Sequence, residues 1–177
     1  MEFKFSELKI GDLVFTSSKS VIGSIIRFFT WGKAQTLDTN FPNHVGILIE
    51  VNSYIFIAEM LEHGLVINSL HAYDGSKNTR ICAIYRNEAL DTNERVVIQE
   101  KLIRYLHKQL KYDFKGLLEF LHLAKNVESR MYCSELAASL HSSYLPLRSK
   151  WSPKDLLVHI SSSDIWKKIN DFEEEKK

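Results

Sequence analysis

The sequence predicts an α+β fold in which an antiparallel β meander or barrel packs against helices. β-rich segments joined by short links occupy the first half of the chain, and amphipathic segments with helix-capping residues occupy the second half. The 177 residues are 45% hydrophobic and 25% charged, a composition that supports one domain with a hydrophobic core. We expect a single domain over residues 1–170 and a charged tail over residues 171–177.

Charge, hydropathy and cysteine content exclude several classes of protein. The net charge of +1 gives no basic footprint for nucleic acid. No stretch reaches about 18 apolar residues, so we expect no transmembrane helix. Residues 1–7 are charged and lack the apolar core of a signal peptide, and two cysteines make no disulfide framework. We therefore expect a cytoplasmic protein with reduced thiols, although an exported chain whose leader had been removed would look the same.

The first segments predict a turn, a strand, a helix and a loop in that order. Gly11 and Asp12 are typical of a turn, and residues 13–15 begin a strand. Apolar pairs about four residues apart over 20–29 predict a short amphipathic helix, which Ser20 can cap. The mostly polar residues 30–42, which include Trp31, favour a loop.

Four further β-rich segments follow with short connections. They span residues 43–51, 54–60, 65–68 and 80–86. Asn52 and Ser53 separate the first two segments and predict a tight hairpin. Because the links are short, we expect the four strands to form an antiparallel meander.

The second half of the chain predicts helices. Asp91 or Thr92 can cap a helix that presents apolar residues at helical spacing, namely Ile98, Leu102, Tyr105 and Leu106. Residues 112–116 interrupt the helical pattern. The remaining predicted helices span residues 117–123, residues 133–140, a segment that begins at Pro153 behind the cap Ser152, and residues 164–169.

Cys133 stands where the helix over 133–140 begins. A thiol at a helix N-terminus lies at the positive end of the helix dipole, beside unpaired backbone N–H groups, and both lower its pKa. A buried, inert cysteine is an equally common outcome, so helix position alone leaves both interpretations open. Cys82 lies in the middle of a β-rich segment, where packing in the core is the better explanation.

His44 is the preferred base for such a thiol. It begins an apolar strand, at an edge from which its side chain can reach a cleft, and Gly46 allows a close approach of another backbone. The other histidines are more typical of solvated or hydrogen-bonded residues, and His159 is the next candidate among them. These others are His63, His71, His107, His122, His141 and His159.

Glu59 is positioned to orient this base. In a hairpin that turns at residues 52–53, His44 faces Leu61, so Glu59 lies diagonal to His44 on the same face of the sheet. A neighbouring carboxylate holds an imidazole in one tautomer. The alternative, a charged residue that protects a strand edge from pairing, fits the same position.

Other chemistries have weaker support. A zinc site needs three or four ligands that include a closely spaced pair, and Cys82 and Cys133 lie far apart without a histidine pair beside them. No phosphate loop or dinucleotide-binding glycine pattern occurs, and Ser134 lacks the nucleophile elbow of serine hydrolases. We expect no metal and no cofactor.

Several short motifs occur in an order that resembles a known family. They are Gly11–Val14, Asn43–Ile47, Ala58–Glu59 followed by Gly64–Val66, Tyr132–Leu136 and Ser152–Leu156. The chain resembles the circularly permuted papain-like hydrolases. This group belongs to the NlpC-type amidohydrolases and includes a YiiX-like bacterial branch and relatives of lecithin–retinol acyltransferase. The resemblance covers residues 8–160, and the histidine precedes the cysteine, as in the permuted group.

The resemblance implies a permuted papain-like fold and a set of catalytic residues. Cys133 would be the nucleophile, His44 the base, and Glu59 the residue that orients the base. Either Tyr112 or Tyr132 would support the substrate or the oxyanion. The backbone N–H of Cys133, at the start of its helix, would be the main oxyanion donor.

The implied activity is that of a cysteine amidase or peptidase that forms a thioacyl-enzyme. Its substrate would be a small peptide, such as one derived from a cell wall. One alternative is a lipid acyl hydrolase or acyltransferase, in which Phe28, Phe29 and Trp31 would receive an acyl chain. Ordinary packing is the preferred explanation for these aromatic residues. The other alternative is a binding module in which Cys133 is inert.

Overall fold

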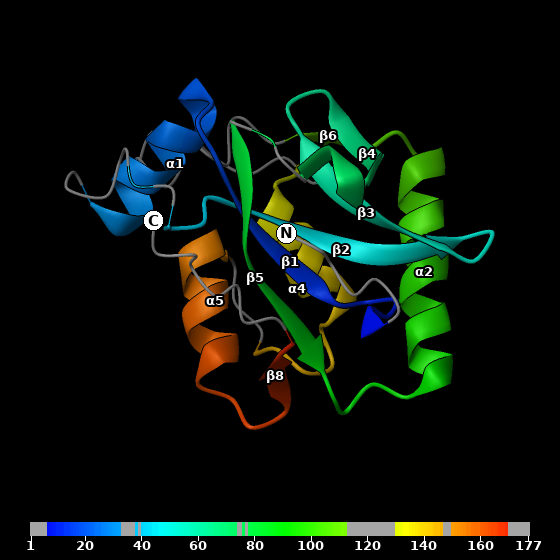
Figure 1. Cartoon of the computed structure of the whole chain (residues 1–177). Coiled ribbons are helices and arrows are strands. Elements are labelled where there is room, and N and C mark those ends of the chain that lie inside the picture. The colour runs from blue at the N-terminus through cyan, green and yellow to red at the C-terminus, as the bar shows by residue number, and fades with distance from the viewer. Residues whose placement is uncertain are drawn as a thin grey trace.

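The computed structural model describes residues 7–32, 38, 40–73, 76, 78–112, 130–146 and 150–169 (Figure 1). Its strands are β1 (Leu13–Ser18), β2 (His44–Val51), β3 (Tyr54–Leu61), β4 (Gly64–Ser69), β5 (Thr79–Asn87), β6 (Lys111–Tyr112), β7 (Arg130–Met131) and β8 (Trp166–Lys168). Its helices are α1 (Val21–Trp31), the 3-10 helix η3 (Leu70–Tyr73), α2 (Thr92–His107), α4 (Cys133–Leu140) and α5 (Pro153–Ser161). The predicted α+β class is confirmed. No helix within these ranges combines the length and the apolar character that crossing a bilayer requires.

Within the described residues, six strands form one open antiparallel sheet in the order β4-β3-β2-β1-β5-β8. The predicted meander is confirmed for β2, β3 and β4 but is wrong for β5, which pairs with β1. The cause is η3, which buries Leu70 against the face of the sheet and carries the chain away from β4. The sheet has edges at β4 and β8, so it does not close into the barrel that was the other expectation.

The β2–β3 hairpin has the register that the sequence predicts. Its turn residues Asn52 and Ser53 have φ angles of +51° and +65°, as a type I′ turn requires. Gly46 consequently pairs with Glu59. A Cβ atom at Gly46 would lie 2.5 Å from the Ile57 side chain, so glycine leaves the space that this side chain occupies. The hairpin thereby fixes which residues of β2 and β3 share a face.

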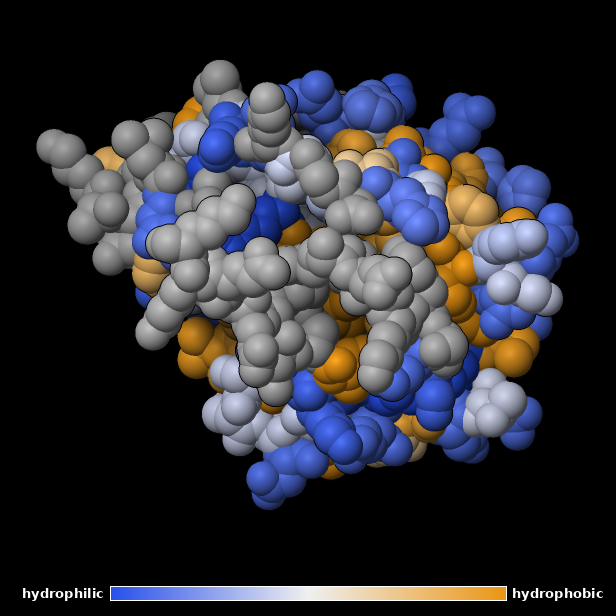
Figure 2. All heavy atoms as spheres, viewed as in Figure 1, coloured by the Kyte–Doolittle hydropathy of each residue, from blue (hydrophilic) through white to orange (hydrophobic). Residues whose placement is uncertain are grey.

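The two faces of the sheet carry separate hydrophobic clusters. One face packs against α4, which lies behind the sheet in Figure 1. The other face carries a smaller cluster, made of Val14, Leu48, Ile57, Leu70, Ile81 and Ile84. In Figure 2, which has the same viewpoint, hydrophilic side chains gather along the rim and hydrophobic ones show between them. Alternate residues of each central strand therefore serve opposite faces.

Three helices begin at the caps that the sequence predicts. In each, a side-chain oxygen accepts a hydrogen bond from a backbone N–H of the first turn: Ser20 from Gly23 at 3.0 Å, Asp91 from Glu94 at 2.8 Å, and Ser152 from Asp155 at 3.0 Å. α4 begins at Cys133, so the predicted placement of this thiol at a helix N-terminus is confirmed.

Two segments that the sequence predicts differ in the structure, one in where its helix ends and one in its type. α1 continues through Trp31, which the sequence placed in a loop, and it ends only at Gly32, where φ is +95°. Residues 166–168 form a strand instead of a helix, because Trp166 pairs with Asn87 at the edge of β5 and is buried there. Tertiary pairing outweighs local helix propensity at this site. The helix predicted over 117–123 and the tail over 171–177 lie outside the described residues.

Cys82 differs from its predicted place in the core. Phe15 pairs with Ala83 and Thr16 pairs with Ile81, so Cys82 is the extra residue of a β-bulge and is only half-buried. Its partial burial nevertheless raises the pKa of the thiol to about 11. Cys82 therefore stays protonated near neutral pH, which makes it a natural control for Cys133.

Candidate active site

His44 is the first residue of β2, and the residue before it is clamped to β1. The buried side chain of Asn43 accepts a hydrogen bond from the Ser18 N–H at 3.0 Å and donates one to the Ser18 carbonyl at 2.9 Å. The Asn43 N–H also donates to the Thr16 carbonyl at 3.0 Å. These bonds join the start of β2 to the end of β1, so the backbone at His44 is held in place.

The structure places His44 and Glu59 side by side. Because Gly46 pairs with Glu59, His44 lies diagonal to Glu59 on the same face. Nε2 of His44 is 2.9 Å from Oε2 of Glu59, and the two side chains are 15% and 1% exposed. A buried carboxylate in this position fixes both the orientation and the tautomer of the imidazole. Nδ1 of the ring remains available for another partner.

Two further side chains hold Glu59. Asn68 of β4 donates to its Oε1 at 2.7 Å, and the Tyr73 hydroxyl of η3 donates to the same oxygen at 2.5 Å. Sequence reasoning missed both residues. Asn68 had a detectable signal, because Val66 pairs with Glu59 and the residue two positions further along β4 shares its face. Tyr73 had no local signal, because its contact depends on the path of η3 across the sheet.

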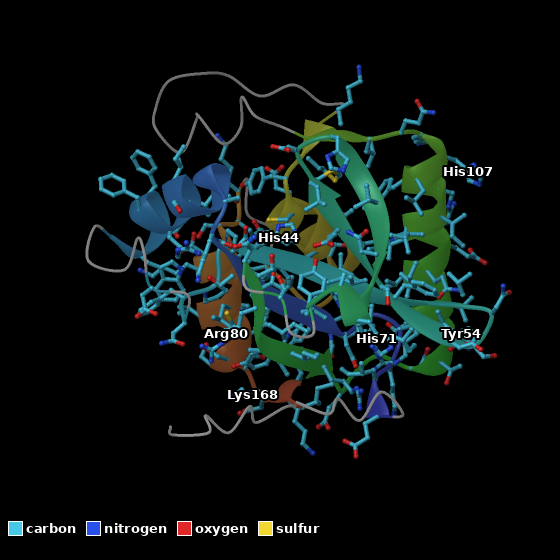
Figure 3. All side chains as sticks on the ribbon, turned by 45° about the horizontal axis from the view of Figure 1, so that its top comes forward. His44, Tyr54, His71, Arg80, His107 and Lys168 are labelled. Carbon is cyan, nitrogen blue, oxygen red and sulfur yellow. The ribbon has the colours of Figure 1, made fainter. Side chains whose placement is uncertain are left out.

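Cys133 approaches the His44 ring from helix α4. α4 packs against β2 and β3, and the thiol at its first residue is 1% exposed. The side chain of Cys133 forms a hydrogen bond with the His44 ring, and the backbone N–H groups of Val45 and Ser134 also bond to the sulfur. Figure 3 shows His44 in the middle of the molecule, at the start of β2. Cys133, His44 and Glu59 thus form one hydrogen-bonded series.

Burial and charge act in opposite directions on this series. Burial alone would raise the pKa of the Cys133 thiol, but the charge of His44 and the hydrogen bonds to the sulfur lower it below the ordinary value. Burial alone would lower the pKa of His44, but Cys133 and Glu59 raise it to about 10. Burial favours a protonated Glu59, yet the bonds from His44, Asn68 and Tyr73 lower its pKa. These shifts act together in favour of a thiolate–imidazolium pair beside an ionised carboxylate.

A pocket of about 380 Å³ lies beside His44 and Glu59. Hydroxyl and amide groups form one part of its wall, and apolar side chains of α1 and β3 form another. Members of the wall include Ser18, Asn68, Tyr73, Thr79, Ile26 and Leu61. The pocket volume falls in the range of sites for small ligands. Cys133 is covered and does not line this pocket, so the base and its carboxylate are the members of the series that face it.

The two tyrosines predicted to assist the site have different positions. The Tyr132 hydroxyl accepts a hydrogen bond from the Trp151 N–H at 3.2 Å, and its side chain is buried. Burial, together with the charge of Glu135, raises the pKa of this hydroxyl. Tyr132 therefore packs between α4 and the segment before α5 and does not line the pocket. Tyr112 belongs to β6, whose backbone pairs with Met131 of β7, and its side chain lies outside the described part of the chain.

Comparison with known proteins concerns the fold. No protein-family model and no curated protein matches this chain. Among solved structures, the chain is similar to the metalloprotein YiiX from Escherichia coli O157:H7, with 19% identity and a TM-score of 0.55, over 79% of this chain and 68% of that one. The likeness supports a YiiX-like fold. In the ranges described for the present chain, no group of three or more His, Cys, Asp or Glu residues is placed to hold a metal ion.

Proposed function

We propose that this chain is a cysteine-dependent hydrolase of the circularly permuted papain-like kind, which cleaves an amide bond through a thioacyl-enzyme. The observation that carries the proposal is the hydrogen-bonded series from the Cys133 thiol through the His44 ring to the Glu59 carboxylate, with 2.9 Å between the last two groups. The histidine precedes the cysteine along the chain, which is the order of the permuted group. A thiolate beside an imidazolium is a nucleophile suited to acyl transfer through a thioester.

Each group of the series has one role in the proposed reaction. The Cys133 sulfur attacks the carbonyl carbon, and the backbone N–H at the start of α4 stabilises the oxyanion. His44 donates its proton to the leaving nitrogen as the C–N bond breaks, which leaves a thioester on Cys133. Neutral His44 then takes a proton from water, whose oxygen attacks the thioester, and the carboxylic acid and the thiolate separate. Glu59 holds the His44 ring through both halves of the reaction.

The pocket supports a small substrate. A volume of about 380 Å³ accommodates a short peptide, whose carbonyl has to reach past the pocket wall to Cys133, because Cys133 does not line the pocket. Its wall combines polar groups such as Ser18 and Asn68 with the apolar side chains of Ile26 and Leu61. Such a wall suits an acyl group that carries polar substituents. The proposed substrate is therefore a small peptide or a related amide, of the kind released from cell walls.

A lipid acyl hydrolase or acyltransferase is the second candidate, and one observation favours it. Ile26 of α1 lines the pocket, and Phe28 and Phe29, two and three positions further along the same helix, are exposed. A series of p-nitrophenyl esters with increasing acyl length separates the candidates. Rates that rise with chain length support the lipid enzyme, and rates that fall beyond short chains support the amidase.

The decisive experiment is the pH dependence of alkylation at Cys133. Iodoacetamide reacts with the thiolate form of a cysteine. For an ordinary thiol, the alkylation rate therefore reaches half its maximum at about pH 8.5. We expect the alkylation rate of Cys133 to reach half its maximum well below that pH, because His44 stabilises the thiolate. The midpoint reports the pKa even though burial of the thiol slows the absolute rate.

Two matched variants control this experiment. In His44→Ala the midpoint should move to the ordinary value or above, because burial then acts without the opposing charge. In Cys82→Ala it should stay unchanged, and Cys82 itself should react only at high pH. A midpoint for Cys133 at or above that of a free thiol would contradict the proposal. Absence of a stoichiometric burst on activated esters would instead indicate a binding module with an inert cysteine.

A further inference from the structure

Helix α1 turns its charged side chain inward and three of its apolar side chains outward. Arg27 is 1% exposed, whereas Ile25, Phe28 and Phe29 are 41%, 42% and 52% exposed. The three apolar residues are separated by three and four positions, so they form one stripe along the helix. The rings of Phe28 and Phe29 meet edge to face, with their centroids 5.0 Å apart. Among the side chains described for α1, none of the exposed ones is charged.

Arg27 fixes the rotation of α1. Its Nη1 donates hydrogen bonds to the Ser17 hydroxyl and to the Ser18 carbonyl, both at 2.8 Å. Both acceptors belong to β1, so a rotation of α1 that buried the phenylalanine rings would break the two bonds. The apolar stripe is therefore held outward by contacts on the opposite side of the helix. A contiguous exposed stripe of this kind is typical of an interaction surface.

A lysine side chain lies near each end of α1. Lys19 is exposed directly before α1. At the other end of the helix, the Lys154 ammonium group of α5 lies 5.0 Å from the centroid of the Trp31 ring. A helix with phenylalanines along its outer face and lysines at both ends matches an anionic bilayer, because the rings enter the acyl boundary while the ammonium groups contact the head groups.

We propose that α1 docks the protein on an anionic lipid bilayer through Ile25, Phe28 and Phe29. α1 lies at one side of the molecule, beside α5 (Figure 1). Gly23 and Ile26 of this helix line the pocket next to His44, so docking brings the pocket close to the lipid surface. A substrate with an acyl chain then reaches the pocket from the interface. Docking itself does not depend on the chemistry of Cys133.

Co-sedimentation of the full chain with vesicles tests the docking. We expect binding to phosphatidylcholine vesicles that contain about a third phosphatidylglycerol, and weaker binding to pure phosphatidylcholine or at high salt. The double variant Phe28→Ser/Phe29→Ser should lower the binding constant by roughly tenfold or more, because both apolar side chains are lost from the stripe. The matched control Val96→Ser/Val97→Ser changes residues of α2 that are 47% and 44% exposed, and it should bind as the wild type does.

A direct readout complements the sedimentation. In Phe29→Trp, brominated lipids should quench the added fluorescence, whereas Val97→Trp on α2 should show no added quenching. Both substitutions are at exposed positions, so folding is preserved, and thermal unfolding checks this. Wild-type protein that stays in the supernatant with anionic vesicles, or an equal effect of the α1 and α2 variants, would overturn the proposal. So would a dimer in solution that the α1 variant dissociates, because a second copy would then be the partner.

The outcome is separable from the proposed function. Cys133→Ala should sediment with vesicles as the wild type does, because the Cys133 thiol is buried and is not part of the exposed stripe. Conversely, the alkylation midpoint of Cys133 should be the same in the Phe28→Ser/Phe29→Ser variant. Loss of vesicle binding in Cys133→Ala would contradict docking through α1 alone.

Discussion

Glu59 is the residue on which the electrostatics of the site depend most. It is almost fully buried, and its carboxylate accepts bonds from His44, Asn68 and Tyr73. In Glu59→Gln the shape is kept but the charge beside His44 is lost. His44 then holds its proton less strongly, and the thiolate loses part of its stabilisation. We expect the alkylation midpoint of Cys133 to rise by about one pH unit and the esterase or amidase rate to fall by roughly tenfold or more.

A carboxylate on the neighbouring strand provides the control for Glu59. Glu50 of β2 is exposed, and its substitution by Gln removes the same charge from the surface. Glu50→Gln should leave the alkylation midpoint unchanged. If the two variants shift the midpoint equally, Glu59 acts through net charge alone and does not orient His44.

His141 makes stability depend on pH. Burial, and secondarily the charge of Arg95, lowers its pKa to about 4, while a bond with the Gly11 carbonyl acts in the other direction. The unfolded chain binds a proton at this residue below about pH 6.5, whereas the folded chain stays neutral until about pH 4. Stability is therefore lost as the pH falls through this window. The loss amounts to about 3 kcal/mol in the free energy of unfolding when the window has been crossed.

Urea unfolding at a series of pH values from about 7 to about 4 measures this loss in the free energy of unfolding. His141→Gln removes the titration, so its free energy of unfolding should fall less steeply with pH than that of the wild type. His107, which is exposed at the end of α2, supplies the control substitution His107→Gln. Parallel pH profiles for wild type and His141→Gln would show that the buried ring is not the source of the acid sensitivity.

At the scale of elements, the β2–β3 hairpin decides whether the site forms. In Gly46→Ala, the new methyl group would lie 2.5 Å from the Ile57 side chain and 3.2 Å from the Ala58 carbonyl. The Ile57 side chain, or the strands themselves, must shift, and we expect this to disturb the placement of His44 beside Glu59. We expect a loss of roughly 1–3 kcal/mol in stability and a rise in the alkylation midpoint of Cys133. Urea unfolding and alkylation measure the two effects.

The exposed end of the same strand gives the comparison for Gly46→Ala. Val51 is 42% exposed at the hairpin turn, so Val51→Ala should change neither quantity appreciably. Full stability together with a normal alkylation midpoint in Gly46→Ala would mean that the hairpin tolerates the methyl group. In that case the close approach at Gly46 would have no role in placing His44.

Elements with a local signal were predictable from the sequence, and elements defined by distant partners were not. The Asn52–Ser53 turn determines the register of β2 and β3, so the diagonal of His44 and Glu59 followed from the sequence. The start of α4 at Cys133 also carried a local signal. β8 forms because β5 offers an edge, and β5 pairs with β1 because η3 redirects the chain. The contact of Tyr73 with Glu59 depends on that same η3 and was therefore invisible locally.

At the scale of the whole molecule, Asp12 joins parts of the fold that are distant in sequence. Its buried carboxylate accepts bonds from Arg86 of β5 at 3.0 and 2.7 Å and lies 3.7 Å from Arg95 of α2. The backbone carbonyl of Asp12 accepts a bond from the Leu48 N–H of β2 at 2.9 Å. The turn at Gly11 and Asp12 is thus a structural junction of β1, β2, β5 and α2.

Asp12→Asn tests this junction. The substitution leaves two partly buried guanidinium groups without their counter-charge, so we expect a loss of about 3–5 kcal/mol in the free energy of unfolding. Glu100→Gln is the control, because Glu100 and Arg104 form an exposed pair with 3.8 Å between their charged groups. A small and equal loss in both variants would show that Asp12 contributes no more than a surface charge.

The pairing of β8 with β5 has a consequence for synthesis on the ribosome. β5 ends at Asn87, and its outer partner begins only at Trp166, so the whole of α2, α4 and α5 is translated between them. Throughout that interval one edge of the nascent sheet has backbone groups without strand partners from this chain. Such an edge is a template for pairing with other chains. Chains that are released before Trp166 should therefore aggregate more readily than completed ones, even though Cys133, His44 and Glu59 have all been synthesised.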